Sequence, residues 1–170
     1  QVVNVNLSLK LKDLIENLTG GSGDDILIGN DLDNVLSGGP GNDSLAGGLG
    51  DDSYVFGTAT TSEADTVAEA ANAGTDRLSF SSLTTDVILG LETSQLQAVH
   101  ANRTLKLNAA SVFEDIVGGS GNDTLTGNSL TNTLTGNAGN DTLTGGGGND
   151  SLVGGSGDDN YVFRTATTVE

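Results

Sequence analysis

A nine-residue period in two windows of the chain constrains its fold more than any other feature. Residues 20–55 consist of four consecutive copies, GGSGDDILI, GNDLDNVLS, GGPGNDSLA and GGLGDDSYV. Residues 118–162 consist of five more, GGSGNDTLT, GNSLTNTLT, GNAGNDTLT, GGGGNDSLV and GGSGDDNYV. A nonapeptide is too short to bury a core of its own, so the copies must stack on one another. The period therefore predicts a solenoid.

Each copy divides into a turn and a short strand. Positions one to six, G-G-x-G-x-D, suit a tight turn, because glycine adopts backbone angles that other residues avoid and lets chains approach closely. Position eight is always Leu or Tyr, whereas positions seven and nine are mostly Ser, Thr or Val. Alternation along a strand then puts position eight inside and its neighbours outside. Two such units make one coil of eighteen residues, with successive coils about 4.8 Å apart.

A longer repeat encloses the nonapeptides. Tyr54-Val55-Phe56 followed by GTATT recurs as Tyr161-Val162-Phe163 followed by RTATT, and QVVNVNLSLKL at 1–11 matches QAVHANRTLKL at 97–107. We therefore expect a piece of a longer tandem protein, with a second unit that lacks its tail. The expected segments are an N-terminal flank (1–19), a first array (20–56), a spacer (57–117), a second array (118–163) and the start of another spacer (164–170).

The series G-G-x-G-x-D-x-U-x resembles the RTX, or haemolysin-type, calcium-binding repeats of secreted bacterial proteins. The [Ile/Phe]-Glu-[Asn/Asp]-[Leu/Ile]-x-Gly-Gly stretch before each array and Tyr-Val-Phe after it are similar to that family's flanks. The resemblance implies an all-β fold, a right-handed parallel β-roll or β-solenoid with calcium ions between the turns of neighbouring coils. Two nonapeptide arrays would be joined by a β-rich spacer.

The residue types suit calcium, a hard cation that takes six to eight oxygens from carboxylates and carbonyls. Turns on one edge are eighteen residues apart, so their position-six side chains should face one ion. Three strong sites are expected, at the pairs Asp25–Asp43, Asp123–Asp141 and Asp141–Asp159. Two weaker ones are expected on the opposite edge, where one carboxylate is replaced by an amide, at Asn34–Asp52 and Asn132–Asp150.

The resemblance also implies the ligands. The earlier turn would offer carbonyls two and four with its Asp, and the later turn carbonyls one and three with its Asp. The three strong sites would then comprise Gly21, Gly23, Asp25, Gly38, Pro40 and Asp43; Gly119, Gly121, Asp123, Gly136, Ala138 and Asp141; and Asn137, Gly139, Asp141, Gly154, Ser156 and Asp159. Asn137 replaces glycine at position two, so some backbone strain is expected there. The position-five residues Asp24, Asp51 and Asp158 are expected to point to solvent.

Charge and composition exclude several function classes. Six Lys and Arg against 23 Asp and Glu give a formal net charge of −17, which opposes binding to nucleic acid or anionic lipid. The absence of Cys and a single His, His100, exclude the usual zinc constellations. No apolar run approaches the roughly 18 residues of a membrane span, so no membrane insertion is expected. No nucleophile motif stands out, and we expect no enzyme. The expected partners are calcium ions and neighbouring repeat units.

The acidic turns repel one another, so we expect a chain that is largely disordered without calcium and folded with it. The leading hypothesis is a calcium-binding structural module, a rigid segment of a secreted or cell-surface bacterial protein. The resemblance implies export by type I secretion. One alternative is an accessory module of an extracellular enzyme of the protease, lipase or alginate epimerase type. Another is an ice- or surface-binding solenoid, suggested by outward threonine pairs such as Thr124 and Thr126.

Two interpretations of the spacer remain open. AANAGTDRL at 71–79 fits a degenerate nonapeptide with Gly74 at position four, Asp76 at six and Leu78 at eight, which favours a continued, looser solenoid. SEADTVAEAANAG instead offers Ser62 as a helix N-cap and apolar residues at helical spacing, which favours a short helix.

Overall fold

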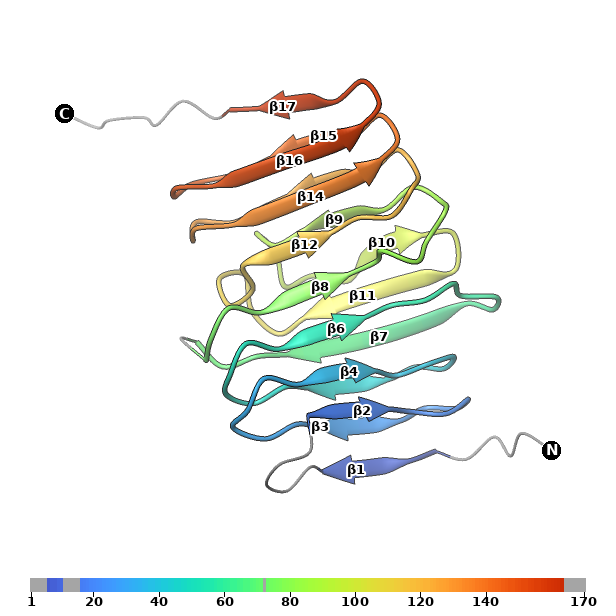
Figure 1. The fold of residues 1–170 in the computed structure, drawn as a ribbon. Coiled ribbons are helices and arrows are strands. Elements are labelled where there is room, and N and C mark those ends of the chain that lie inside the picture. The colour runs from blue at the N-terminus through green and yellow to red at the C-terminus, as the bar shows by residue number, and fades with distance from the viewer. Residues whose placement is uncertain (1–5, 11–15, 72, 164–170) are drawn as a thin grey trace.

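The structure is a computed structural model that describes residues 6–10, 16–71 and 73–163 (Figure 1). Every regular element in these ranges is a β-strand, and none of the described residues forms a helix long and apolar enough to cross a membrane. The predicted flank at 1–19 is described only in part, and residues 164–170 lie outside the described residues. The strands are β1 (Ser8–Lys10), β2 (Asn17–Thr19), β3 (Ile26–Ile28), β4 (Val35–Ser37), β5 (Ser44–Ala46), β6 (Ser53–Val55), β7 (Glu63–Ala68), β8 (Arg77–Ser79), β9 (Ile88–Gly90), β10 (Gln97–His100), β11 (Arg103–Leu107), β12 (Asp115–Val117), β13 (Thr124–Thr126), β14 (Thr133–Ala138), β15 (Thr142–Thr144), β16 (Ser151–Ser156) and β17 (Asn160–Val162).

The strands stack in sheets that follow the length of the molecule (Figure 1). One sheet, ordered β16-β14-β12-β8-β6-β4-β2, runs without interruption from the first array through the spacer into the second. The remaining strands form a sheet ordered β1-β3-β5-β7-β11-β10 and another ordered β17-β15-β13-β9. The strand pairs are parallel, except that β10 and β11 are antiparallel. The two arrays therefore belong to one stack.

The register confirms that two nonapeptides make one coil. Within the arrays, position eight pairs with position eight of the repeat eighteen residues later, as in Leu27 with Leu45. In the spacer the offset grows, since Tyr54 pairs with Leu78 and Leu78 with Ile116. The additional residues lie in the connections between the paired strands, so the parallel stacking continues. This all-β, parallel arrangement fits a β-roll.

The core is a column of position-eight side chains. Seven of the nine, from Leu27 to Leu143, are at most 1 % exposed, which confirms the predicted alternation. Leu152 is only partly buried, and Tyr161 is 40 % exposed, contrary to the expected burial. Tyr161 lies on β17, which pairs with β15 alone, so no further coil covers its ring. Burial at position eight thus depends on the next coil as well as on the repeat itself.

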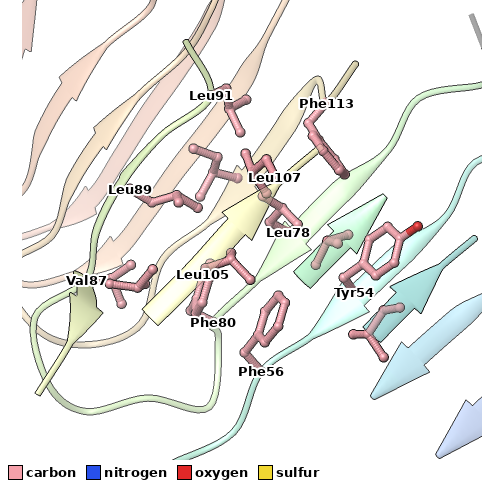
Figure 2. Close-up of a cluster of buried hydrophobic side chains, with 14 of the residues drawn as sticks. Tyr54, Phe56, Leu78, Phe80, Val87, Leu89, Leu91, Leu105, Leu107 and Phe113 are labelled. Carbon is pink, nitrogen blue, oxygen red and sulfur yellow. The ribbon is translucent and has the colours of Figure 1, made fainter. Parts of the chain in front are cut away.

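The spacer continues the stack and thickens its core. Residues 63–68 form β7, paired with β5 and β11, and the short helix is not formed. Phe56 and Phe80 stack with ring centroids 5.0 Å apart, and Tyr54 and Phe113 form a T-shaped pair with ring centroids 6.1 Å apart (Figure 2). The parallel strand stack therefore continues through the described part of the spacer, as the interpretation without a helix predicted. These aromatic side chains are buried in the same hydrophobic cluster as the position-eight leucines.

Candidate metal centres

The turns between strands place the position-six side chains inside the molecule. Asp25, Asp43, Asp52, Asp123 and Asp141 are at most 3 % exposed. Their counterparts Asp150 and Asp159, near the C-terminal end of the stack, are half-buried. An ionised carboxylate is costly to bury unless it is paired or coordinates a metal, so each of these positions requires compensating partners.

One of the two oxygens of each carboxylate, Oδ1, accepts a hydrogen bond from a backbone amide of the preceding coil. The amide of Asp25 donates to Oδ1 of Asp43 at 2.9 Å. The amide of Asp123 donates to Oδ1 of Asp141 at 2.7 Å, and the amide of Asp141 to Oδ1 of Asp159 at 3.0 Å. The structure thus brings together the members of all three predicted strong pairs.

The opposite edge is built in the same way. The amide of Asn34 donates to Oδ1 of Asp52 at 2.7 Å, and the amide of Asn132 donates to Oδ1 of Asp150 at 3.0 Å. The oxygen of the Asn34 amide side chain is already engaged, because it accepts from the backbone N–H of Asn30 at 2.8 Å. These two pairs therefore have the geometry of the others with one carboxylate fewer.

The other oxygen of each position-six carboxylate, Oδ2, indicates whether the turns can bind a cation. In Asp25 and Asp123, Oδ2 accepts from the position-two amide of its own turn, at 2.6 and 2.7 Å. In Asp43, Asp52 and Asp141, Oδ2 is buried and has no hydrogen-bond donor. A buried oxygen that carries negative charge and lacks a donor fits a metal ligand.

Burial raises the proton affinity of these groups. Burial, together with the negative charges of Asp65 and Asp25, raises the pKa of Asp43 to about 6 against the lowering effect of the Asp25 amide. Burial likewise raises the pKa of Asp123 to about 6, with Asp141 contributing repulsion. A divalent cation between the turns would remove the repulsion that both carboxylates experience.

The predicted carbonyl ligands point into the space between coils. In the first site the carbonyls of Gly21 and Gly23 face the following turn, where a Cβ on either facing glycine would collide with them. The carbonyl of Gly38 points back towards Gly20, and the carbonyl of Pro40 accepts from the amide of Gly23 at 2.8 Å. Carbonyls two and four therefore point forward and carbonyls one and three point back, as the predicted ligand pattern requires.

The second array repeats these directions. Among the predicted ligands, the carbonyls that face a glycine of the neighbouring coil include those of Gly121, Gly136, Asn137, Gly139 and Gly154. The carbonyl of Ser156 accepts from the amide of Gly139 at 2.9 Å, and Ala138 lies opposite Ser156 across β14 and β16. Asn137 has a φ of 80°, the left-handed region that glycine favours, which confirms the strain expected there.

The hydrogen bonds of the position-six side chains form one ladder along the stack. The position-five side chains form a second ladder, on the exposed side of the turns. Oδ1 of Asp24 accepts from the amide of Asn42 at 2.9 Å, and Oδ1 of Asp51 accepts from the amide of Thr75 at 2.8 Å. Here each side chain binds the following coil, whereas each position-six side chain binds the preceding one. Asn serves as well as Asp, since the amide of Asp158 donates to Asn140 Oδ1 at 2.8 Å. This ladder needs oxygen rather than charge, so it is structural.

The position-six ladders continue into the spacer, where sequence reasoning assigned no site. The amide of Asp43 donates to Oδ1 of Asp65 at 3.0 Å. Asp65 and Glu63 are both ion-paired with the guanidinium of Arg103, which is 3 % exposed and lies 5.2 Å from the ring centroid of Phe56. At this end of the position-six ladder, the guanidinium of Arg103 supplies the positive charge that neutralises the carboxylates. Only the degenerate Asp65-Thr66-Val67 pattern could have indicated it.

The ladder on the opposite edge ends differently. The amide of Asp52 donates to Oδ1 of Asp76 at 3.0 Å, and the amide of Asp76 donates to Oε2 of Glu114 at 2.9 Å. Glu69 lies in the same place, and one carboxylate oxygen of each of Asp52, Glu69 and Asp76 lies within 4.8 Å of the others. The degenerate repeat at 71–79 signalled Asp76, but no sequence signal marked Glu69.

Comparison with protein families identifies the repeats. The model described as the RTX calcium-binding nonapeptide repeat (4 copies) matches residues 19–54, 113–129 and 126–161, which together make up half of the chain. The chain belongs to the RTX calcium-binding repeat family. No curated protein matches the chain significantly. Membership of this family indicates that the chain is a calcium-binding structural module. The carboxylate oxygens of Asp43 and Asp141 that lack a hydrogen-bond donor are ligands of the type that calcium prefers.

Proposed function

We propose that this RTX chain is a calcium-dependent, non-enzymatic structural module of a secreted or cell-surface bacterial protein. In this proposal the stack is a closed, right-handed β-roll with calcium ions held between successive turns. The ions make the roll a rigid segment that carries or spaces other parts of the parent protein. Type I secretion, in which an unfolded chain is exported, suits a module that folds only where calcium is plentiful.

One observation carries the proposal: buried position-six carboxylates keep an oxygen without a donor in turns whose carbonyls converge between coils. Asp43 and Asp141 illustrate it, since Oδ1 accepts a backbone hydrogen bond while Oδ2 has no partner. Each strong site combines two carboxylates with four carbonyls, which gives six oxygens, within the range that calcium takes. The two amide-containing sites offer one charge fewer and would bind more weakly.

The net charge of the chain supplies the switch. With a formal charge of −17, the chain resists compaction when calcium is scarce, because the turns place carboxylates against each other. Extracellular calcium modules bind in the range of about 10⁻⁴ to 10⁻³ M, which would keep the chain unfolded inside a cell and folded outside it. Binding free energy is then folding free energy.

A calcium titration of the purified chain followed by far-ultraviolet circular dichroism tests this function, with magnesium as the ionic control. We expect a cooperative gain of strand signal with calcium and little with magnesium. Asp141→Asn removes a charge shared by two strong sites and should raise the calcium midpoint several-fold. Asp150→Asn, the matched change on the weaker edge, should raise it less. A full strand signal in the presence of chelator would contradict the proposal.

A further inference from the structure

One carboxylate cluster extends beyond the segments that match the repeat family. Asp52 belongs to the last repeat of the first array, within a matched segment, whereas Glu69 and Asp76 lie outside the matched segments, in the connection between β7 and β8. All three side chains are buried, with 1 %, 5 % and 1 % of their surface exposed. One carboxylate oxygen of each lies within 4.8 Å of the others.

The register explains how Glu69 reaches this place. Ala46 pairs with Ala68, so Glu69 stands where Gly47 stands in the preceding coil, at position one of a turn. All nine repeats have glycine at that position. A Cβ at Gly47 would collide with Asp52 Oδ2 and with Glu69 Oε1, which shows that the glycine leaves room for these two carboxylates. The connection from Glu69 to Asp76 is two residues longer than the turn from Gly47 to Asp52, and this length accommodates the larger side chain.

Each member of the cluster has one oxygen that is satisfied and one that is not. Asp52 Oδ1 accepts from the amide of Asn34 at 2.7 Å, and Asp76 Oδ1 accepts from the amide of Asp52 at 3.0 Å. Glu69 Oε1 accepts from the hydroxyl of Tyr54. The remaining oxygens, Asp52 Oδ2, Glu69 Oε2 and Asp76 Oδ2, are buried without a donor.

The surroundings hold the cluster in place without neutralising it. Asn108 grips the backbone of Glu69, donating to its carbonyl at 2.5 Å and accepting from its amide at 3.1 Å. Glu114 accepts from the amide of Asp76 at 2.9 Å. The basic side chains that form ion pairs in the described part of the chain, Arg77 and Arg103, bind other carboxylates. Three carboxylates therefore share one buried space, and none of the described ion pairs supplies a cation to them.

We infer that Asp52, Glu69 and Asp76 form a calcium site that joins the first array to the spacer, in addition to the sites between family repeats and sharing Asp52 with the Asn34–Asp52 site. The donors are all oxygens, which excludes a preference for zinc or a softer metal. Two oxygens on one calcium ion can lie up to about 5 Å apart, since each bond is about 2.3–2.6 Å, and the cluster is within that limit. Magnesium normally retains several waters, which a site this deeply buried does not accommodate well.

Tyr54 makes this site observable by itself. Its hydroxyl oxygen points away from the apolar cluster (Figure 2) and donates to Glu69, so an ion held by Glu69 lies close to its ring. The chain has no Trp and two Tyr, Tyr54 and Tyr161. In a Tyr161→Phe background, terbium luminescence excited through tyrosine therefore reports the surroundings of Tyr54 alone. Terbium is a close substitute for calcium because it is also a hard, oxygen-seeking cation.

The experiment compares Glu69→Gln with Glu92→Gln in that background. Glu92 is exposed between β9 and β10 and contributes to no candidate site. Glutamine at 69 keeps an oxygen that can accept from Tyr54, so the change removes charge with little change of shape. We expect terbium emission in the parent and in Glu92→Gln, its displacement by calcium, and loss of most of it in Glu69→Gln. Asp76→Asn should reduce it similarly and serves if Glu69→Gln proves unfolded by circular dichroism.

Equilibrium dialysis with calcium separates this inference from the proposed function. Equal emission from Glu69→Gln and Glu92→Gln would overturn the site. Absence of tyrosine-excited emission in a chain that binds several calcium ions would also overturn it, while the sites between repeats would stand. Normal emission with a stoichiometry of one would support the site and leave the repeat turns without a metal role. A chain that binds neither ion would overturn both.

Discussion

The two copies of Tyr-Val-Phe that end the arrays have the same sequence and opposite environments. Tyr54 is completely buried and Phe56 is 2 % exposed, whereas Tyr161 is 40 % and Phe163 81 % exposed. Their local structure is alike, because each tyrosine hydroxyl accepts from the position-one glycine amide of its own repeat, at 2.6 Å from Gly47 and 2.9 Å from Gly154. The repeat therefore fixes the strand and the direction of the side chain but does not by itself bury it.

The spacer makes the difference. Over the first copy, β8 pairs with β6, Phe80 stacks on Phe56, and Phe113 forms a T-shaped pair with Tyr54. Arg103 lies above Phe56 with its charge neutralised by Glu63 and Asp65. Among the described residues no strand follows β17, so the second copy has no such cover. In a stack of short coils each layer is completed by its neighbour, and the last described layer remains incomplete.

Truncating the last aromatic residue of each motif should separate the two environments most strongly. Phe56→Ala removes a buried, stacked ring and should lower the free energy of unfolding by about 3–5 kcal/mol. Phe163→Ala removes a ring that is mostly exposed and should change it by less than about 0.5 kcal/mol. Urea unfolding in saturating calcium, followed by circular dichroism, measures both. Similar losses for the two variants would contradict the view that the spacer buries the first copy.

Removing the cation of the cover should have the next largest effect. Arg103→Met keeps most of the side-chain length over Phe56 but leaves Glu63 and Asp65 buried without a counter-charge. Breaking a buried ion pair by removing one partner costs about 3–5 kcal/mol, and we expect about 3 kcal/mol because methionine retains the apolar contact. Arg77→Met is the matched control, since Arg77 pairs with Asp115 from an exposed position. Equal effects of the two substitutions on urea unfolding would show that the buried pair adds nothing.

Acid should partly replace calcium at the covered end. Burial, with repulsion between neighbours, raises the pKa of Asp52 and Asp76 to about 6 and that of Glu69 to about 7. Folded pKa values above the unfolded ones mean that the folded chain binds more protons, so this contribution is complete below about pH 4 and is lost as the pH rises through 6 to 7. In chelator, the residual far-ultraviolet strand signal should therefore be larger at pH 5 than at pH 8, and saturating calcium should flatten the dependence. A strand signal that rises with pH in chelator would refute this.

The periodic part of the fold could be predicted from sequence, because a nonapeptide repeats its own packing. Eighteen residues per coil, burial at position eight and the approach of Asp25 to Asp43 all follow from the period and from strand alternation. The strain at Asn137 could be predicted as well, since position two of a neighbouring copy, such as Gly155, needs a positive φ. These features require only neighbours that the repeat itself defines.

The non-periodic part could not be predicted. Arg103 reaches Asp65 across 38 residues, and no local pattern indicates that pairing. Glu69 enters a site only because the β7 strand is in register with β5 and the following connection is two residues longer than a repeat turn. The burial of Tyr161 also depends on residues outside its own repeat. Tyr161 lies in the same Tyr-Val-Phe motif as Tyr54, but it is half-exposed because no strand covers it among the described residues.

The smallest predicted effect isolates the tyrosine hydroxyl, which the two motifs share. Tyr54→Phe leaves the amide of Gly47 and the carboxylate of Glu69 without their partner in a buried place, and should cost about 1–3 kcal/mol. Tyr161→Phe removes a bond that water can replace at a half-exposed position, and should cost less than about 0.5 kcal/mol. Urea unfolding in saturating calcium compares them directly. If the ratio reversed, the hydroxyl of Tyr161 would be stabilising an end that the structure leaves uncovered, and the cover provided by the spacer would not explain the difference between the two motifs.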